Sequence, residues 1–193
     1  ANENKVVVGY DVTDVESAST TVSLLYEVEA TLNESLTSGD TTAITLSSTA
    51  NFPTAGTIMI DEEMITYTAK SGQDLVGTIT RGANNTIAGA HSSGAVAWIK
   101  TSTVTGDVGA AVAHGTGKAI VWTPKTDIDG FYSANSSIRV SANDGSAGSM
   151  VGSASSSDFI LDTKNPTLGS FPLTVYASST PATLALSTTD DTA

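Results

Sequence analysis

The sequence predicts an all-β fold, an antiparallel β-sandwich, and three observations support this prediction. Apolar and polar residues alternate in short runs, which is the period of a strand with one buried face. Gly, Asn, Asp and Ser separate these runs and favour turns. No run has the period of an amphipathic helix, and the 193 residues include 30 Thr and 25 Ser.

Five strands are predicted within residues 1–165, two near the start of this segment and three near its end. Residues 5–12 and 21–29 form the first two, with a polar turn between them that holds Asp11, Asp14 and Glu16. Residues 118–122, 137–142 and 157–162 form the others, and Asn143-Asp144-Gly145 closes the fourth strand with a strong turn signal. Short strands with turns at this spacing indicate an antiparallel sandwich.

The middle of the chain carries its own set of predicted strands. They cover residues 43–46, 57–60, 64–67, 75–80 and 95–98. We expect Asp61-Glu62-Glu63 to form a solvated hairpin turn between two of them. A block of this length is long enough for a small β-domain with a thin core.

Residues 166–193 start a further β-pattern. Asn165-Pro166 interrupts the alternation, which returns at residues 170–176 and 183–186. We expect these strands to begin another β-domain or to complete the sheet of a neighbour. The chain begins at Ala1 rather than Met, so we expect it to be processed or to be part of a longer polypeptide.

Several of these segments resemble one repeat type. Residues 7–14, 22–26, 105–109, 120–123 and 138–145 are similar to the immunoglobulin/fibronectin-III-like repeat of large bacterial surface proteins and tailed-phage virion proteins. The resemblance implies a hairpin flanked by Tyr26 and Trp98, in whose tip residues 31–97 are inserted. The expected domains are therefore a discontinuous sandwich of residues 1–30 plus 98–165, an insert of residues 31–97, and the segment 166–193.

The insert has a resemblance of its own. Residues 52–67, 80–83 and 90–96 are similar to a small β-module that recurs in phage structural proteins. The resemblance implies that His91 orders the loop from Arg81 to Gly94. It implies a structural or adhesive role and carries no catalytic residue.

Charge and composition exclude several classes of function. Lys and Arg total 8 against 20 Asp and Glu, a formal net charge of −12, and the eight cations are scattered singly. Nucleic-acid binding needs clustered cations, so it is not expected. The sequence has no apolar run long enough to span a membrane, so no membrane insertion is expected. The absence of Cys excludes disulfides and thiol catalysis.

The acidic turns are candidate metal ligands. In a sandwich, the loop after the first strand and the loop after Val140 lie at the same pole, and Ca²⁺ takes six to eight oxygen ligands. The sequence therefore predicts a calcium site as its one candidate cofactor site, although no EF-hand spacing is present. Asp127 and Asp129 form a weaker candidate at the other pole. The predicted ligands are Asp11, Asp14, Glu16, Asn143 and Asp144.

Other residues favour structural roles. His91 and His114 lie in loops rich in small residues, and we interpret both as turn or surface histidines rather than catalytic bases. Tyr10 and Trp122 are expected in the sandwich core, and Trp98 at the junction of insert and sandwich.

These observations lead to a structural function. We expect no enzyme, but a structural subunit of a virion, either a phage head decoration or a tail or fibre component, that acts by assembly. Its partners would be other copies of itself or neighbouring virion or surface proteins, and its location the virion surface or the cell exterior. The alternatives are an adhesin or a receptor- or glycan-binding module, and a subunit of a cell-surface layer or extracellular filament.

Overall fold

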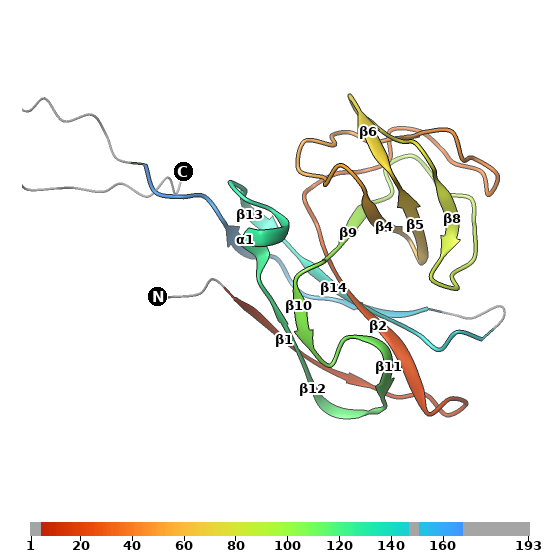
Figure 1. Ribbon diagram of the computed structural model, residues 1–193, viewed down its shortest axis with the longest axis vertical. Helices are drawn as coiled ribbons and strands as arrows, with labels where there is room; N and C mark the ends of the chain where they lie inside the picture. Colours follow the sequence, from red (N-terminus) through yellow and green to blue (C-terminus); the bar gives the residue numbers. More distant parts are fainter. Residues whose placement is uncertain (1–4, 147–150, 168–193) are drawn as a thin grey trace, which may run out of the picture.

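The computed structural model confirms the all-β prediction (Figure 1) and describes residues 5–146 and 151–167. The predicted strands at residues 170–176 and 183–186 lie outside the described residues. The elements run in the order β1 (Val6–Val12), β2 (Ser19–Tyr26), β3 (Ile44–Thr45), β4 (Gly56–Ile60), β5 (Glu63–Tyr67), β6 (Ala69–Ser71), β7 (Asp74–Val76), β8 (Thr80–Ala83), β9 (Ala97–Lys100), β10 (Val104–Gly106), β11 (Gly109–Ala113), β12 (Gly115–Trp122), α1 (Pro124–Asp127), β13 (Tyr132–Ser136), β14 (Ile138–Asn143), β15 (Gly152–Ser155) and β16 (Phe159–Asp162). In the described part of the chain, no helix is long and apolar enough to cross a membrane.

Two sheets meet around a pair of aromatic rings. The first sheet has the order β1-β12-β10, and the second contains β15-β14-β2, with β11 pairing with β2. Tyr26 ends β2 and Trp122 ends β12, and their rings stack with centroids 5.0 Å apart. Trp122 is fully buried, as predicted, whereas Tyr10 is half-buried and donates its hydroxyl to the Asp107 carbonyl at 2.5 Å. The stacked rings of Tyr26 and Trp122 connect the two sheets at the centre of the core.

A long bent hairpin forms the last described part of the chain. β14 pairs with β15, and β13 pairs with β16, so residues 132–143 run antiparallel to residues 152–162. The strand predicted at residues 137–142 is thus the second half of a longer segment. Strands β10 and β11 were not predicted, because their runs are short and rich in Gly, Ala and Thr.

Strand β9 joins the middle block to the rest of the molecule. It pairs with β2 through Tyr26↔Ile99 and with β4 through Ile58↔Ile99. One sheet therefore runs β15-β14-β2-β9-β4-β5-β8. Residues 31–97 share this sheet, and also the main hydrophobic cluster, with the remainder of the chain.

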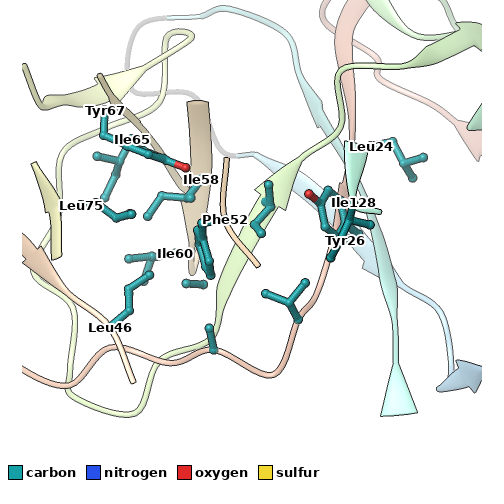
Figure 2. Packing of buried hydrophobic residues seen from close by; sticks show 14 of the residues in the cluster. Leu24, Tyr26, Leu46, Phe52, Ile58, Ile60, Ile65, Tyr67, Leu75 and Ile128 are labelled. Carbon is teal, nitrogen blue, oxygen red and sulfur yellow. The ribbon is translucent and has the colours of Figure 1, made fainter. Parts of the chain in front are cut away.

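A second small sheet covers the core of the middle block. Its order is β3-β7-β6, and it contributes Ile44 and Leu75, both fully buried. Figure 2 shows Ile58, Ile60 and Ile65 of β4 and β5 gathered in the same core, with Leu24, Tyr26 and Ile128 on the other side of β9. The main hydrophobic cluster therefore extends across β9.

The strand predicted at residues 75–80 is broken at Gly77. β7 ends at Val76, and Gly77 has a φ of +81°, which L-residues rarely adopt. A Cβ at this position would lie 2.4 Å from Thr68 Oγ1, which accepts a hydrogen bond from the Thr78 amide at 2.8 Å. The chain turns here because only glycine fits both constraints.

Substituting Gly77 with alanine should destabilise the fold by at least about 2 kcal/mol, because backbone strain and a steric clash add. Gly72→Ala is the matched control: Gly72 has a φ of +60° with open space around its missing Cβ, so only strain of about 1 kcal/mol applies. Urea unfolding of the two variants measures the difference. Equal stabilities would contradict the clash.

Candidate functional site

The predicted calcium ligands lie at the C-terminal ends of β1 and β14 and in the turns that follow them. Asp11 lies in β1 and Asn143 ends β14, while Asp14, Glu16 and Asp144 lie in the turns that follow these strands. Hydrogen bonds from the Ser17 hydroxyl and the Glu16 amide lower the pKa of Asp14, and the charge of Asp144 acts in the opposite direction. The structure therefore brings Asp14 and Asp144 into electrostatic range of each other.

Local hydrogen bonds occupy the acidic side chains of the first turn. Asp14 accepts from the Glu16 amide at 3.0 Å and from the Ser17 hydroxyl at 2.5 Å. Asp11 accepts from the Gly117 amide at 2.7 Å. These contacts stabilise the turn after β1 and tie β1 to the start of β12.

The turn after β14 is organised in the same way. Asn143 accepts from the Gly145 amide at 2.7 Å and donates to the Asn84 carbonyl at 3.1 Å. Asp144 accepts from both the amide and the hydroxyl of Ser146 at 2.9 Å. Among the described residues, no three carboxylate or imidazole groups converge closely enough to hold a metal ion. The calcium site stays a prediction.

Chelation tests the calcium prediction. A bound cation stabilises only the folded state, so EDTA should lower the melting temperature by several degrees and added Ca²⁺ should restore it. Asp14→Asn should abolish this response, whereas Asp158→Asn, an exposed carboxylate elsewhere, should retain it. A melting temperature that EDTA leaves unchanged would remove the site.

A buried network of charged side chains lies at the β4–β5 hairpin. Glu63 begins β5, and its side chain is 2 % exposed. Its carboxylate accepts from Nε and an Nη of Arg81, both at 2.8 Å, and from the amides of Gly82 and Gly89 at 2.8 and 2.9 Å. His91 Nε2 lies 2.7 Å from the same carboxylate. Glu63 thus holds the loop from residue 81 to residue 91, the role that the resemblance implied for His91.

The prediction of a solvated turn at Glu62-Glu63 is wrong for Glu63. Asp61 and Glu62 form the exposed turn, and Asp61 has a φ of +52°. Glu63 shares its strand face with Ile65 and Tyr67, both buried. Because Glu63 precedes the apolar residues Ile65 and Tyr67 at a spacing of two, the sequence already indicated that its carboxylate lies on a buried face.

The interpretation of His91 as a turn or surface residue is also wrong, because the residue is 6 % exposed. Its Nδ1 lies 2.7 Å from Asp61 Oδ2, and its Nε2 faces Glu63. Ionised carboxylates only accept hydrogen bonds, and a neutral imidazole donates from one nitrogen. Donation to both carboxylates would therefore require a proton on each ring nitrogen, and in either state His91 links Asp61 to Glu63.

The environment of Glu63 fits stability rather than catalysis. Burial alone would raise the pKa of Glu63, but hydrogen bonds from Arg81, Gly89, His91 and Gly82 outweigh it and lower the pKa to about 2. Five donors occupy the carboxylate, which offers about four lone-pair positions. The group therefore has no free position from which to take a proton from a substrate.

The low pKa of Glu63 predicts a loss of stability in acid. The contribution is fully present above the ordinary pKa of 4.5 and disappears as the pH falls toward 2, a total of about 3 kcal/mol. Glu63→Gln should remove most of this acid dependence and should destabilise the fold at pH 7, because Arg81 and His91 lose their buried partner. Denaturant unfolding at several pH values measures both effects.

The control is Glu62→Gln, which changes an exposed carboxylate one residue away. This variant should unfold like the natural chain across the whole pH range. If Glu63→Gln retained the full acid dependence, the buried network would not be its source.

The second acidic candidate organises the helical turn. Asp127 accepts from Trp122 Nε1 at 2.7 Å and from the Ser102 amide at 3.0 Å. Asp129 instead lies 3.5 Å from Lys125. The two carboxylates therefore have different partners, and Asp127 fixes the buried tryptophan.

Trp98 packs at the junction of the middle block with β2, as predicted. It is 8 % exposed, and Arg139 of β14 lies over its ring at 5.7 Å from the centroid. The residues of its cluster come from β2, β4, β5 and the segment before β15: Leu25, Met59, Met64 and Val151. A ring buried in this way offers no platform for a sugar.

Among the described residues, two concave surfaces and the edge of β1 are candidate places for a partner to bind. A groove of about 380 Å³ lies between the start of β1 and strand β16, and Ile160, 65 % exposed, lines it. A cleft of about 400 Å³ is lined by Tyr26, Lys100 and Asp127, among others. Along β1, Val7 is 70 % exposed, and within the described residues β1 pairs only with β12.

No family model, curated protein or solved structure matches this chain.

Proposed function

We propose that the chain is a structural subunit of a virion surface or appendage, a phage head decoration or a tail or fibre component, that acts by assembly. The observation that carries this proposal is the open edge of β1, with Val7 exposed on it. Unpaired strand edges are templates for pairing with another chain. The resemblance of the turns and core positions to repeats of phage virion and bacterial surface proteins supports the same reading.

The proposed architecture is an immunoglobulin-like sandwich of residues 1–30 plus 98–165, with residues 31–97 inserted in a hairpin tip. The antiparallel pairing of Leu25 with Lys100 and of Tyr26 with Ile99 supports it, because the segments that enter and leave the block lie side by side. A domain with adjacent ends adds little loop-closure entropy to a hairpin. Residues 166–193 would begin a further domain or an exchanged segment.

The electrostatics of the chain suit an assembling subunit. Its net charge of −12 keeps copies apart unless a specific contact overcomes the repulsion. Its buried charges at Glu63, Arg81 and His91 are paired with one another and hold a loop in place.

A binding module is the second candidate, and the cleft favours it. The cleft has the volume of a small-ligand site and is lined by hydroxyl, ammonium and carboxylate groups. Asp127 already accepts from Trp122, Ser102 and Thr103, so Lys100 and Thr126 would be the groups that donate to the hydroxyls of a glycan. In this reading the chain would be an adhesin or receptor-binding domain.

Immunogold electron microscopy of the native source tests the proposal. Antibodies raised against the chain should label phage particles in a regular array, on the head or along the tail. Antibody pre-absorbed with the purified chain is the control and should leave the particles unlabelled.

Label confined to a fibre tip would favour the binding module. Label on cell envelopes or filaments would favour the surface-layer or filament alternative and contradict the virion assignment.

A further inference from the structure

Strand β1 has one paired and one open edge. Its register with β12 runs from Val6↔Trp122 to Val12↔Gly115, and within residues 5–146 and 151–167 no strand pairs along its other edge. The strand contains no proline, so each of its residues can donate and accept along a ladder. The hydroxyl of Tyr10 anchors it to the carbonyl of Asp107 beyond β10. The open edge is therefore long and firmly held.

The two faces of β1 differ in their burial. Val6, Val8 and Tyr10 are half-buried and pack against the main core. The alternate positions of β1, together with Lys5 directly before it, are exposed, and they form an outward stripe of one cation, one apolar side chain, one glycine and one anion: Lys5, Val7, Gly9 and Asp11.

We propose that a second copy of this chain pairs with the open edge of β1 through its own β1, antiparallel and centred on Val8. In this register Lys5 of each copy lies opposite Asp11 of the other, and Val7 lies opposite Gly9. The inference rests on the proposed function, since it supplies the contact by which copies would assemble. The contact is isologous and closes as a two-fold dimer, which would then be the building block.

The outward stripe is complementary to itself in this register. Opposite charges placed directly across an antiparallel pair stabilise it, and symmetry provides the Lys5–Asp11 pair twice. A Cβ built on Gly9 would have no atom within 4 Å, so there is open space for the Val7 side chain of the second copy.

Other registers lose this complementarity. A slip of one residue would turn the outward residues of one copy toward the inward face of the other. A shift of two residues that places Gly9 opposite Gly9 sets Val7 against Asp11 and removes both charge pairs. The charges and the glycine therefore specify a single alignment.

The expected affinity is modest. A contact made by one strand edge lies at the small end of protein interfaces, and exposed charge pairs are weakened by salt. The dimer should therefore depend on protein concentration and should weaken as the ionic strength rises.

Sedimentation velocity of the full chain at low ionic strength tests the charge pairs. Lys5→Asp places two carboxylates opposite each other twice in the dimer and should weaken the association about tenfold. The double variant Lys5→Asp/Asp11→Lys reverses both pairs and should restore it. Because Asp11 also accepts from the Gly117 amide, the melting temperature of the double variant is checked in parallel.

Single cysteines test the register, since the chain has none of its own. A mixture of the Val7→Cys and Gly9→Cys variants under oxidised glutathione should form the mixed disulfide faster than either variant alone forms its own. Val15→Cys is the control for random collision, because Val15 is 99 % exposed and lies beyond β1.

Three results would each overturn the proposal. They are a monomer at every concentration, a dimer that the charge variants leave unchanged, and a Val15→Cys disulfide that forms as fast as the mixed one. The first includes the case in which residues 168–193 of the same chain cover the edge. None of the three bears on where the gold label falls, so the failure of this contact and the failure of the virion assignment are separate results.

Discussion

The double pairing of β9 is the constraint on which the rest of the structure depends. Ile99 lies opposite Tyr26 of β2 on one side and opposite Ile58 of β4 on the other. Strand pairing therefore continues from β2 through β9 to β4, which lies in the middle block. A second connection lies at the β4–β5 turn, where Arg139 of β14 donates to the Asp61 carbonyl at 3.0 Å. With a shared sheet and a polar contact beside it, the middle block is held in one orientation relative to β2 and β14.

Most strands could be predicted because apolar residues recur in short runs between turn residues, and in β1 one face is half-buried while the other is exposed. The inward and outward positions of β1 differ at every step. Strands with weak alternation were missed: β11 consists of Gly, Ala and Val, and its place follows from pairing with β2 rather than from its own sequence. The break at Gly77 was missed because it depends on Thr68, which the fold brings beside it.

The buried charge network could be predicted only in part. The alternation of β5 places Glu63 on the same face as Ile65, which marks its burial. Its partners Arg81 and His91 lie 18 and 28 residues further along the chain, and no local pattern connects them. A charged residue on a buried face indicates that a partner exists, because an unpaired charge there costs several kcal/mol. The identity of the partner requires the fold.

The negative net charge of the chain and the open edge of β1 both affect whether copies of the chain associate indiscriminately. An edge that any strand can join promotes aggregation, and natural proteins protect such edges with charges. Here Lys5 and Asp11 stand at the two ends of the outward stripe of β1, and Val7 and Gly9 lie between them. A partner strand without the opposite pattern would place no opposite charge across from Lys5 and Asp11, and the net charge of −12 repels copies that approach in any other way. The same residues that discourage indiscriminate pairing therefore favour one partner, a strand with the identical sequence running in the opposite direction.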